Sequence, residues 1–508
     1  MRCGRLRITI GDVATFFLQN RVERTMIRTF TTLLSMVFWL TAFAPVRAQD
    51  AGTNHPLDSH LTESYTEDLD ALLERKYIRV LTTYNRTNFF LAHGKLRGFE
   101  YDLLRQYRKA LNKKTTRREI QIVFEFIPVS RDRLIPDLVD GYGDIAAAGL
   151  TVTPERQKQV DFTNSYLTDI DEVLVTHKSV APIQDLTALS GHSVFVRRSS
   201  SYYESLLTLN RQLTAQGRRP VKIVQADENL ETEDILELVN SGAIARTACD
   251  SHIADLWAEI LTDIRVYGDV TLRKGGDIAW AVRKTSPALK ASLDRFVKAH
   301  RRGTRLGNIF FTRYYENTTW IKNPLAGDSG KRLAEYTPLF KEFAARYGFD
   351  WRLIGAMAFQ ESGFDQSKVS PQGAVGIMQI RPETAADPKV GIPDVSRVEN
   401  NIQAGVKYLN FLREHYFSDK AIRPRDQVRF SLAAYNAGPV KMHRARKKAR
   451  NMHLDPNRWF RNVEMGMLKI VGQETVRYVS NINKYYVIYN SAHEQVEKRE
   501  AAIEQVKK

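Results

Sequence analysis

The sequence has 508 residues, of which 43% are hydrophobic, and its formal net charge is +17 at pH 7. This length supports two or three domains with sizeable cores, and the positive charge favours a nucleic acid, an anionic lipid or an anionic cell-wall polymer as partner. Nucleic acid is disfavoured, because the sequence has no zinc-finger spacing, aromatic RNA-binding signature or Walker motif.

The N-terminal segment has the pattern of a secretory signal peptide. Arg28 precedes the apolar run TFTTLLSMVFWLTAFA, and small residues follow as far as Ala48. We therefore predict a signal peptide over residues 1–48, with Met26 as an alternative start and an uncleaved anchor as the alternative fate. Cleavage leaves Cys249 as the one cysteine of the mature chain, so no internal disulfide is expected.

The next part of the chain alternates between strand-like and helical runs. A polar linker is predicted over residues 49–68, and from 69 to 303 runs such as YIRVLTTY alternate with runs such as FEYDLLRQYRKAL. This alternation predicts an α/β domain with a largely parallel sheet. The pattern breaks near residue 303 and the turn-rich stretch NPLAGDSGK follows, so a second linker is predicted over residues 304–334.

The remainder is almost wholly helical and predicts a second, all-α domain over residues 335–492, followed by a charged tail over 493–508. The basic run KMHRARKKAR is typical of a solvated helix face. Apolar periodicity predicts helices over residues 333–348, 351–362, 398–416, 426–437 and 473–490.

A carboxylate stands on the apolar face of one of these helices. In the stretch WRLIGAMAFQES, Ile354, Met357 and Glu361 share one face. A buried, unpaired carboxylate usually stays protonated with a raised pKa, which is the state that general-acid chemistry at neutral pH requires. The alternative is a Glu361 that pairs with an arginine or a helix N-terminus and only stabilises the fold.

Three further stretches of the helical domain carry unusual residues. Gly373 and Gly376 allow close backbone approach, and Tyr435 and Tyr478 lie on apolar stripes. Taken singly, a tyrosine on an apolar stripe is most often a core residue with a satisfied hydroxyl. The three stretches are SPQGAVGIMQI (370–380), SLAAYNAGP (431–439) and ETVRYVSNINKYY (474–486).

In this order the four motifs resemble the lytic transglycosylase (SLT, goose-lysozyme-like) family, whose pattern is ES, S-x-x-G-A-x-G-L-M-Q, A-Y-N-A-G and E-T-x-x-Y-V. The resemblance covers about residues 335–492, with Ile377 in place of the leucine. It implies that Glu361 is the sole catalytic carboxylate, which protonates the bond between N-acetylmuramic acid and N-acetylglucosamine and then helps the muramoyl 6-hydroxyl to form a 1,6-anhydro ring. It also implies substrate contacts from Ser370, Met378, Gln379, Tyr435, Asn436, Glu474 and Tyr478.

An ordinary glycosidase would need a second carboxylate. The nearest candidates, Asp365, Glu383 and Asp387, do not share the stripe of Glu361. A peptidoglycan hydrolase and a solute-binding receptor with a wall-docking module remain the alternatives. The sequence has no EF-hand loop and no His/Cys ligand cluster, so neither a metal nor a cofactor is implied.

The α/β domain contains a candidate carboxylate site. In GDIAAAGLTVTPERQKQVDFTNSYL, Thr153 suits an N-cap and Pro154 the first helical position. Arg156 then falls in the first turn, beside free backbone N–H groups, where it could bind a carboxylate. An arginine that caps a sheet edge is the alternative.

With GFEYDLL, VFVRRSSSYYESL and ARTACDSHIADL, this segment resembles the family 3 periplasmic solute-binding proteins over about residues 75–300. In that family two α/β lobes close on an amino acid. The resemblance implies that Arg156 binds the ligand carboxylate, Thr151 donates beside it and Asp250 faces the ammonium. Gly149 stands where amino-acid binders often carry a hydroxyl residue, which leaves a muropeptide open as the ligand.

Together the two resemblances imply an enzyme that cuts peptidoglycan glycan strands, located in the periplasm and peripherally attached to the outer membrane. They imply a first domain whose ligand regulates the second, and no nucleic-acid partner.

Overall fold

The computed structural model describes residues 63–92, 95–113, 121–318 and 328–507. The predicted signal peptide and most of the first predicted linker lie outside these ranges. None of the helices in the described ranges combines the length and the apolar character that a membrane span requires.

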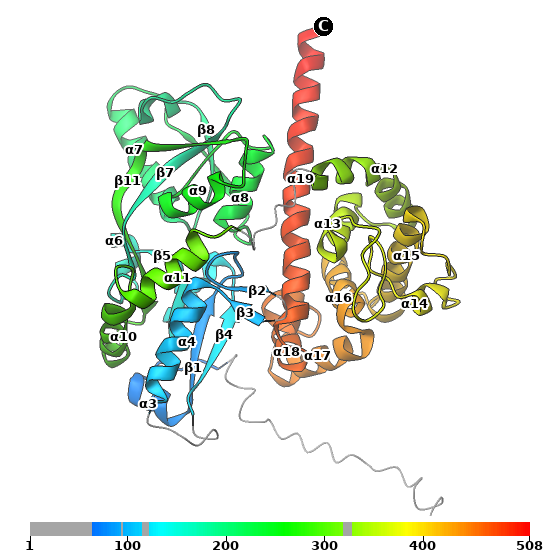
Figure 1. Cartoon of the computed structure of the whole chain (residues 1–508), viewed down its shortest axis with the longest axis horizontal. Helices are drawn as coiled ribbons and strands as arrows, with labels where there is room; N and C mark the ends of the chain where they lie inside the picture. Colours follow the sequence, from blue (N-terminus) through cyan, green and yellow to red (C-terminus); the bar gives the residue numbers. More distant parts are fainter. Residues whose placement is uncertain (1–62, 93–94, 114–120, 319–327, 508) are drawn as a thin grey trace, which may run out of the picture. The chain divides into compact units, whose positions relative to one another are not determined.

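The first domain has a central sheet with the strand order β10-β7-β11-β5-β1-β4, and β6 also pairs with β11 (Figure 1). The strands β4, β1 and β5 pair in parallel, as predicted. The prediction of a largely parallel sheet is wrong for the rest, because β11 runs antiparallel to β5, β6 and β7, and β10 runs antiparallel to β7. The bounds are β1 Tyr77–Thr82, β4 Val123–Pro128, β5 Ile145–Thr151, β6 Asp161–Phe162, β7 Leu167–His177, β10 Arg246–Asp250 and β11 Ile264–Val282.

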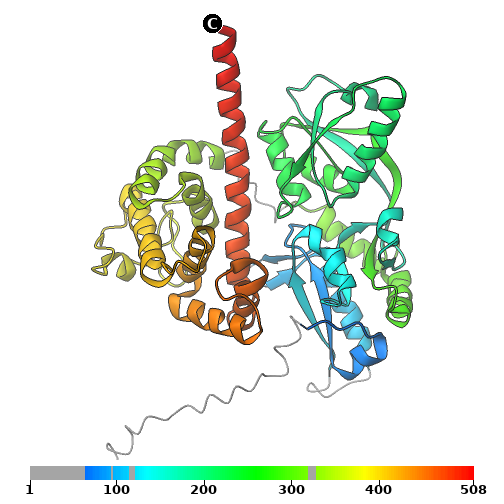
Figure 2. The ribbon, with the colours of Figure 1, turned by 180° about the vertical axis from the view of Figure 1, so that it is seen from behind.

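Helices cover this sheet in two groups that correspond to two lobes (Figure 2). The first group packs on β1, β4 and β5 and consists of α3 Leu69–Glu74, α4 Phe99–Leu111 and α5 Leu134–Val139, with α10 Pro287–His300 packed on α3 and α4. The second group packs on β7, β10, β11 and β8 Ser193–Arg197, and it consists of α7 Ser201–Ala215, α8 Thr232–Asn240 and α9 Ser251–Ala258. The strand β8 pairs in parallel with β9 Lys222–Ala226. The short helix α6 Pro154–Gln157 follows β5, and β2 Phe90–Ala92 pairs with β3 Lys95–Arg97.

The linker predicted over residues 304–334 contains a buried helix. Residues Arg305–Tyr315 form α11, which packs against α4 and α9. The hydroxyl of Tyr314 donates to Asp102 at 2.6 Å, and that of Tyr315 donates to Asn88 at 2.8 Å. The aromatic residues of this helix bury one face against the first domain, so the domain extends through α11 instead of ending at residue 303.

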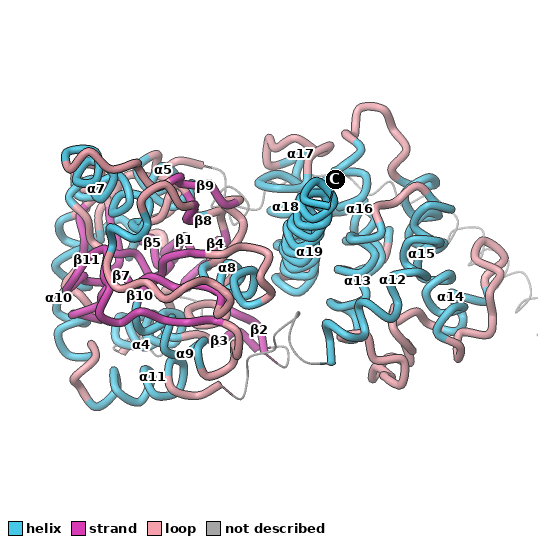
Figure 3. Tube along the Cα trace, turned by 90° about the horizontal axis from the view of Figure 1, so that it is seen from above, coloured by secondary structure: helices cyan, strands magenta, loops and turns pink. Residues whose placement is uncertain are grey.

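The second domain is all-α, as predicted, and α13 packs against both α12 and α19 (Figure 3). The helix α19 continues through the predicted tail, and the basic run lies on a helix of its own, α17. The bounds are α12 Asp328–Tyr347, α13 Trp351–Ser362, α14 Pro382–Ala386, α15 Val398–Tyr416, α16 Pro424–Ala437, α17 Pro439–Asn451, α18 Glu464–Ile470 and α19 Gln473–Lys507, and the chain is kinked at Phe460 and Arg461 just before α18.

Candidate active site and ligand cleft

The helix α13 places Glu361 in its last turn. Asp350 caps its N-terminus by accepting a hydrogen bond from the Arg352 backbone N–H at 2.9 Å. Gly363 ends the helix in the left-handed conformation, with φ 70°, which glycine adopts without strain. Ile354 and Met357, which share the face of Glu361, are fully buried. The predicted stripe is therefore the face of α13 that packs into the domain.

The carboxyl of Glu361 is half-buried, and its partner is a phenol. The Tyr478 hydroxyl donates to Glu361 Oε1 at 2.5 Å, while the Lys368 ammonium bonds the Glu361 backbone carbonyl. Burial raises the pKa of Glu361 to about 7, against the smaller lowering effects of the Tyr478 hydrogen bond and the Lys368 charge. No arginine pairs with Glu361 among the described residues, so the ion-paired structural alternative finds no support.

The loop after α13 folds back over the end of the helix. The Ser362 hydroxyl donates to the Ile377 carbonyl at 2.9 Å. Gly376 has φ +77°, and a Cβ at this position would lie 2.3 Å from Asn401 Nδ2, so a larger residue does not fit. Asn401 is fully buried; its Oδ1 accepts from the Met378 N–H at 2.9 Å and its Nδ2 donates to the Val375 carbonyl at 3.0 Å.

Two predicted substrate residues of this loop, Ser370 and Gln379, are held by local hydrogen bonds. Ser370 Oγ accepts from the Ala374 N–H at 3.0 Å. Gln379 has φ 47°, and its amide donates to the carbonyls of Lys368 at 3.0 Å and Gly376 at 2.9 Å. Both side chains are half-buried, and their orientation is therefore fixed by the loop itself.

Tyr435 links this loop to α16. Its hydroxyl donates to the Met378 carbonyl at 2.9 Å, whereas the Met378 side chain is fully buried, so Met378 contributes a carbonyl group rather than an exposed side chain. Burial and the nearby Glu361 charge both raise the pKa of Tyr435 well above its ordinary value. Tyr435 and Glu361 are therefore close neighbours.

The last two predicted contacts, Asn436 and Glu474, are exposed. Asn436 Oδ1 accepts from the Thr475 hydroxyl at 2.7 Å, which joins the end of α16 to the start of α19. Glu474 lies one turn before Tyr478 on α19, and no hydrogen bond or ion pair joins it to Glu361 in the described part of the chain.

The other acids near the motif do not partner Glu361. Asp365 accepts from the backbone and hydroxyl of Ser367 at 2.9 and 2.7 Å. Glu383 and Asp387 are exposed and line a separate cavity beside α14. Within the described ranges, no group of three or more His, Cys, Asp or Glu side chains is arranged to hold a metal ion.

In the first domain, the end of β5 and the short α6 form one side of a cavity of about 240 Å³. Thr153 caps α6 by accepting from the Arg156 N–H at 3.2 Å, with Pro154 at the first helical position, as predicted. The buried Arg156 guanidinium donates to the carbonyls of Thr151 at 2.7 Å and Ser199 at 2.8 Å. Arg156 therefore both ties the end of β5 to the turn before α7 and lines the cavity.

Asp250 lies at the end of β10 and borders an adjoining space of about 20 Å³. One of its carboxylate oxygens is buried without a hydrogen-bond partner, and burial, with the nearby Glu172, raises its pKa to about 7. Arg131 borders both spaces and pairs with Glu231 at 2.6 Å. Sequence patterns gave no reason to single out Arg131, because its role depends on contacts between distant segments.

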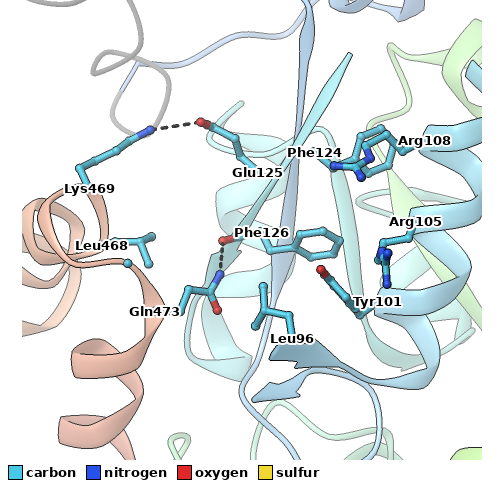
Figure 4. Close-up of a pocket in the computed structure, with 11 residues that line it drawn as sticks. Leu96, Tyr101, Arg105, Arg108, Phe124, Glu125, Phe126, Leu468, Lys469 and Gln473 are labelled. Carbon is cyan, nitrogen blue, oxygen red and sulfur yellow. Dashed lines mark hydrogen bonds and ion pairs between the residues drawn. The ribbon is translucent and has the colours of Figure 1, made fainter. Parts of the chain in front are cut away.

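Contacts from α18 and α19 reach the first domain. Lys469 pairs with Glu125 at 3.1 Å and the Gln473 amide donates to the Phe126 carbonyl at 3.4 Å, beside a cavity of about 270 Å³ that α4 and β4 also line (Figure 4). Further along α19, the buried Lys484 donates to the Tyr84 carbonyl at 2.6 Å and lies 3.5 Å from Asp234. The helix that carries Tyr478 therefore also contacts the first domain.

Comparisons with known proteins match both domains. A family model described as bacterial extracellular solute-binding proteins, family 3, matches residues 78–314, which confirms the fold class of the first domain, and one described as the transglycosylase SLT domain matches residues 338–458. Among solved structures, an ancestral arginine-binding protein bound to arginine is 24% identical and covers 47% of this chain and 99% of its own, with a TM-score of 0.39.

Among curated proteins, the chain is similar to the membrane-bound lytic murein transglycosylase F of Desulfosudis oleivorans, with 33% identity over 81% of this chain and 89% of the relative. The protein of the same name from Stutzerimonas stutzeri is 27% identical over 83% of this chain and 86% of the relative. Because the similarity spans both domains in the same order, the chain belongs to the membrane-bound lytic murein transglycosylase F family.

Proposed function

We propose that this protein is a lytic transglycosylase that cleaves the β-1,4 bond between N-acetylmuramic acid and N-acetylglucosamine in peptidoglycan and leaves a 1,6-anhydromuramoyl end. The observation that carries the proposal is Glu361, a carboxyl group whose side-chain partner is a phenol, and whose pKa burial raises to about 7. At neutral pH a substantial fraction of such a group is protonated and available as a general acid.

The proposed reaction uses the carboxyl group of Glu361 twice, first as an acid and then as a base. Glu361 first donates its proton to the glycosidic oxygen, so that the bond from this oxygen to the muramoyl anomeric carbon breaks and N-acetylglucosamine leaves. The muramoyl 6-hydroxyl then attacks the anomeric carbon and gives its proton to the Glu361 carboxylate. The acid is regenerated and no water is consumed, so one carboxylate suffices, in contrast to an ordinary glycosidase.

Tyr478 would position the acid through both steps. Its hydroxyl donates to Glu361 Oε1, so a bond to the carboxylate form persists after the proton has left. The hydrolase alternative requires a second carboxylate near the reacting carbon. Apart from burial, the pKa of Glu361 is affected by two neighbouring groups, Tyr478 and Lys368, and neither of them is a carboxylate.

We propose substrate contacts for Ser370, Gln379, Tyr435, Asn436, Glu474 and the carbonyl of Met378, with Tyr478 acting on the acid. Support comes from the Tyr435–Met378 hydrogen bond and from the proximity of Tyr435 to Glu361. These groups would hold the sugar rings so that the anomeric carbon lies next to the acid.

We further propose that the first domain binds an amino acid or the peptide stem of a muropeptide and thereby regulates the second. Arg156 retains N–H groups for a carboxylate beyond the two that bond protein carbonyls, and Asp250 offers a buried oxygen without a partner to an ammonium group. The contacts of Lys484 on α19 and Lys469 on α18 supply a physical connection between the first domain and these two helices. A ligand regulates only if it binds one arrangement of these contacts better than another.

The proposed location is the periplasm, with peripheral attachment to the outer membrane. It rests on the predicted signal peptide and on the words "membrane-bound" in the names of the relatives. The substrate in that location is the glycan strand of the cell wall.

The test is digestion of purified peptidoglycan by the parent, by Glu361→Gln and by the matched control Asp365→Asn, which changes a nearby acid without touching Glu361. Loss of product in Glu361→Gln by roughly 10²-fold or more, with near-parental activity in Asp365→Asn, is expected. Near-parental digestion by a folded Glu361→Gln protein would overturn the proposed acid.

A further inference from the structure

A cavity of about 270 Å³ lies where α18 and α19 meet α4 and β4. Figure 4 shows its two sides: Lys469 and Gln473 come from α18 and α19, whereas Arg105 and Arg108 come from α4. The cavity shares no lining residue with the one beside Arg156, and none of the predicted ligand or substrate contacts lines it. Its volume is close to the lower end of the usual range of ligand pockets, about 300 Å³, so it suits a small ligand.

The strand β4 presents a free edge to this cavity. It is the last strand of the central sheet, and no further strand pairs with it in the described part of the chain. The Val123 N–H donates to the Lys76 carbonyl, on the side of β1. Because alternate residues of a strand direct their backbone groups to opposite sides, those of Phe124 and Phe126 face the free edge. The Gln473 amide, which donates to the Phe126 carbonyl from the cavity side, agrees with this direction. The edge therefore offers backbone groups to an extended peptide.

Two arginines of α4 supply positive charge to the cavity. Arg105 and Arg108 are three positions apart, so they are neighbours on one face of the helix. Burial raises the pKa of Tyr101, whereas the charges of Arg105 and Arg108 lower it, which places both guanidiniums close to this phenol. The Arg105 side chain is 43% exposed and lies 3.5 Å from Asp102, and the Arg108 guanidinium forms no ion pair within the described ranges. Both retain N–H groups for a carboxylate.

The remaining walls restrict the kind of anion that fits. Glu125, the one carboxylate among the lining residues, lies 3.1 Å from the Lys469 ammonium, so its charge is compensated. Most other lining side chains are apolar, and the rings of Tyr101 and Phe126 have centroids 4.9 Å apart. An inorganic anion would leave the apolar walls and the strand edge unused. A carboxylate that carries a peptide backbone and an apolar side chain uses all three features.

We propose that this cavity binds the C-terminal end of a short, free peptide. Arg105 and Arg108 hold its carboxylate, the free edge of β4 holds its backbone, and the aromatic wall holds its apolar last side chain. Because α18 and α19 complete the cavity, the bound peptide contacts both domains. The inference goes beyond the proposed function, because it involves neither Glu361 nor the cavity beside Arg156.

The test uses the full chain, with N-acetyl-alanyl-phenylalanine as the probe. Acetylation removes the ammonium group that a ligand of the first domain would offer to Asp250. We expect calorimetry to show saturable binding of one probe per chain. The corresponding C-terminal amide should bind about tenfold more weakly, because it cannot form charge-assisted hydrogen bonds with the guanidiniums. Equal affinities of the acid and the amide, or no measurable binding of the acid, would overturn the proposal.

Variants at the end of α4 separate binding from an effect on the helix. Arg108→Gln removes a lining guanidinium and should lower the affinity for the acid about tenfold, but not that for the amide. Lys109→Gln removes the same charge from the same last turn, and because Lys109 is exposed and does not line the cavity, the affinity should not change. Arg108→Lys keeps the charge without the planar fork and should give an intermediate affinity. Equal losses in Arg108→Gln and Lys109→Gln would overturn the proposal.

Hydrogen exchange locates the bound probe. Pairing with the free edge of β4 should slow the exchange of the Phe124 and Phe126 amides. Protection of residues 151–156 instead would place the probe in the other cavity and overturn the proposal. Displacement of the probe by inorganic phosphate at equal concentration would identify a site for any small anion, which also overturns it. A tenfold tighter binding of a probe extended at its N-terminus would identify the tail of a protein, and not a short peptide, as the occupant.

The parent protein distinguishes this inference from the proposed function. If it releases 1,6-anhydromuramoyl ends from peptidoglycan but does not bind the probe, the peptide site alone is wrong. If it binds the probe with the expected dependence on Arg108 and releases no such ends, the proposed function alone is wrong.

Discussion

The hydroxyl of Tyr478 lies 2.5 Å from Oε1 of Glu361 and joins two helices that are 117 positions apart in the sequence. A phenol can bond a carboxyl group without supplying a charge that would force its ionisation. Burial can therefore raise the pKa of Glu361 to about 7, although the Tyr478 bond and the Lys368 charge both act to lower it.

Tyr478→Phe should move the alkaline limb of the pH–rate profile to higher pH. The hydrogen bond from Tyr478 lowers the pKa of Glu361, so its removal raises this pKa further and keeps the acid protonated over a wider range. The free energy of unfolding should fall by about 1 kcal/mol through the lost bond. The measurement is kcat/KM from pH 5 to 9; an unmoved limb would mean that Glu361 is not the group that titrates.

Glu361→Gln should stabilise the fold at alkaline pH. The folded-state pKa of Glu361 is about 7, whereas its ordinary value is 4.5. As pH rises between these two values, Glu361 ionises in the unfolded chain before it ionises in the folded one, so the parent protein becomes progressively less stable. The gain in Tm should therefore be larger at pH 8 than at pH 4. Asp365→Asn should show the opposite pH dependence of Tm, because hydrogen bonds from Ser367 lower the pKa of Asp365. The same pH dependence of Tm in both variants would contradict the raised pKa of Glu361.

Tyr435→Phe should reduce turnover more than stability. Only a hydroxyl is removed from a ring that stays packed against Tyr408, but the Met378 carbonyl loses its donor and the loop after α13 loses an anchor. We expect a fall in kcat of about tenfold, with a loss of stability of about 1 kcal/mol. A large drop in Tm with normal kcat would identify Tyr435 as a core tyrosine only.

Asp250→Asn should abolish ligand binding by the first domain while leaving it folded. The substitution removes the charge proposed to face a ligand ammonium, at a group whose pKa burial raises to about 7. Arg156→Ala should also abolish binding, but it additionally breaks bonds to the Thr151 and Ser199 carbonyls and should destabilise the domain. The measurement is calorimetry with wall-derived peptides, with peptidoglycan cleavage followed in parallel.

Cleavage that responds to these peptides in the parent, but not in Asp250→Asn, would support regulation. Binding by the parent without any change in cleavage would leave the first domain with a tethering role and contradict the regulatory proposal.

Local patterns were sufficient for several of these features. The stripe that carries Glu361 and the cap formed by Thr153 and Pro154 depend on residues within a few positions of one another, and the structure has both. The partners of Glu361 and of the loop after α13 are different, because Tyr478 bonds Glu361 and Asn401 bonds that loop from other helices. One sequence does not specify which helices meet.

The two errors in the fold have the same origin. The antiparallel pairing of β7 with β11 joins strands separated by the whole second lobe, and alternation of strands and helices carries no information about it. The helix Arg305–Tyr315 follows an arginine- and glycine-rich turn, which is typical of a domain boundary. Its aromatic face indicates a place in the first domain only once the helix is known to pack against α4.

Whether Glu361 cleaves glycan strands without water can be measured by mass spectrometry of peptidoglycan fragments produced in ¹⁸O-labelled water. We expect muropeptides that end in 1,6-anhydromuramic acid, lack the mass of one water and carry no ¹⁸O, and we expect them to disappear with Glu361→Gln. Fragments with a free reducing end that has incorporated ¹⁸O would show a hydrolase and contradict the account.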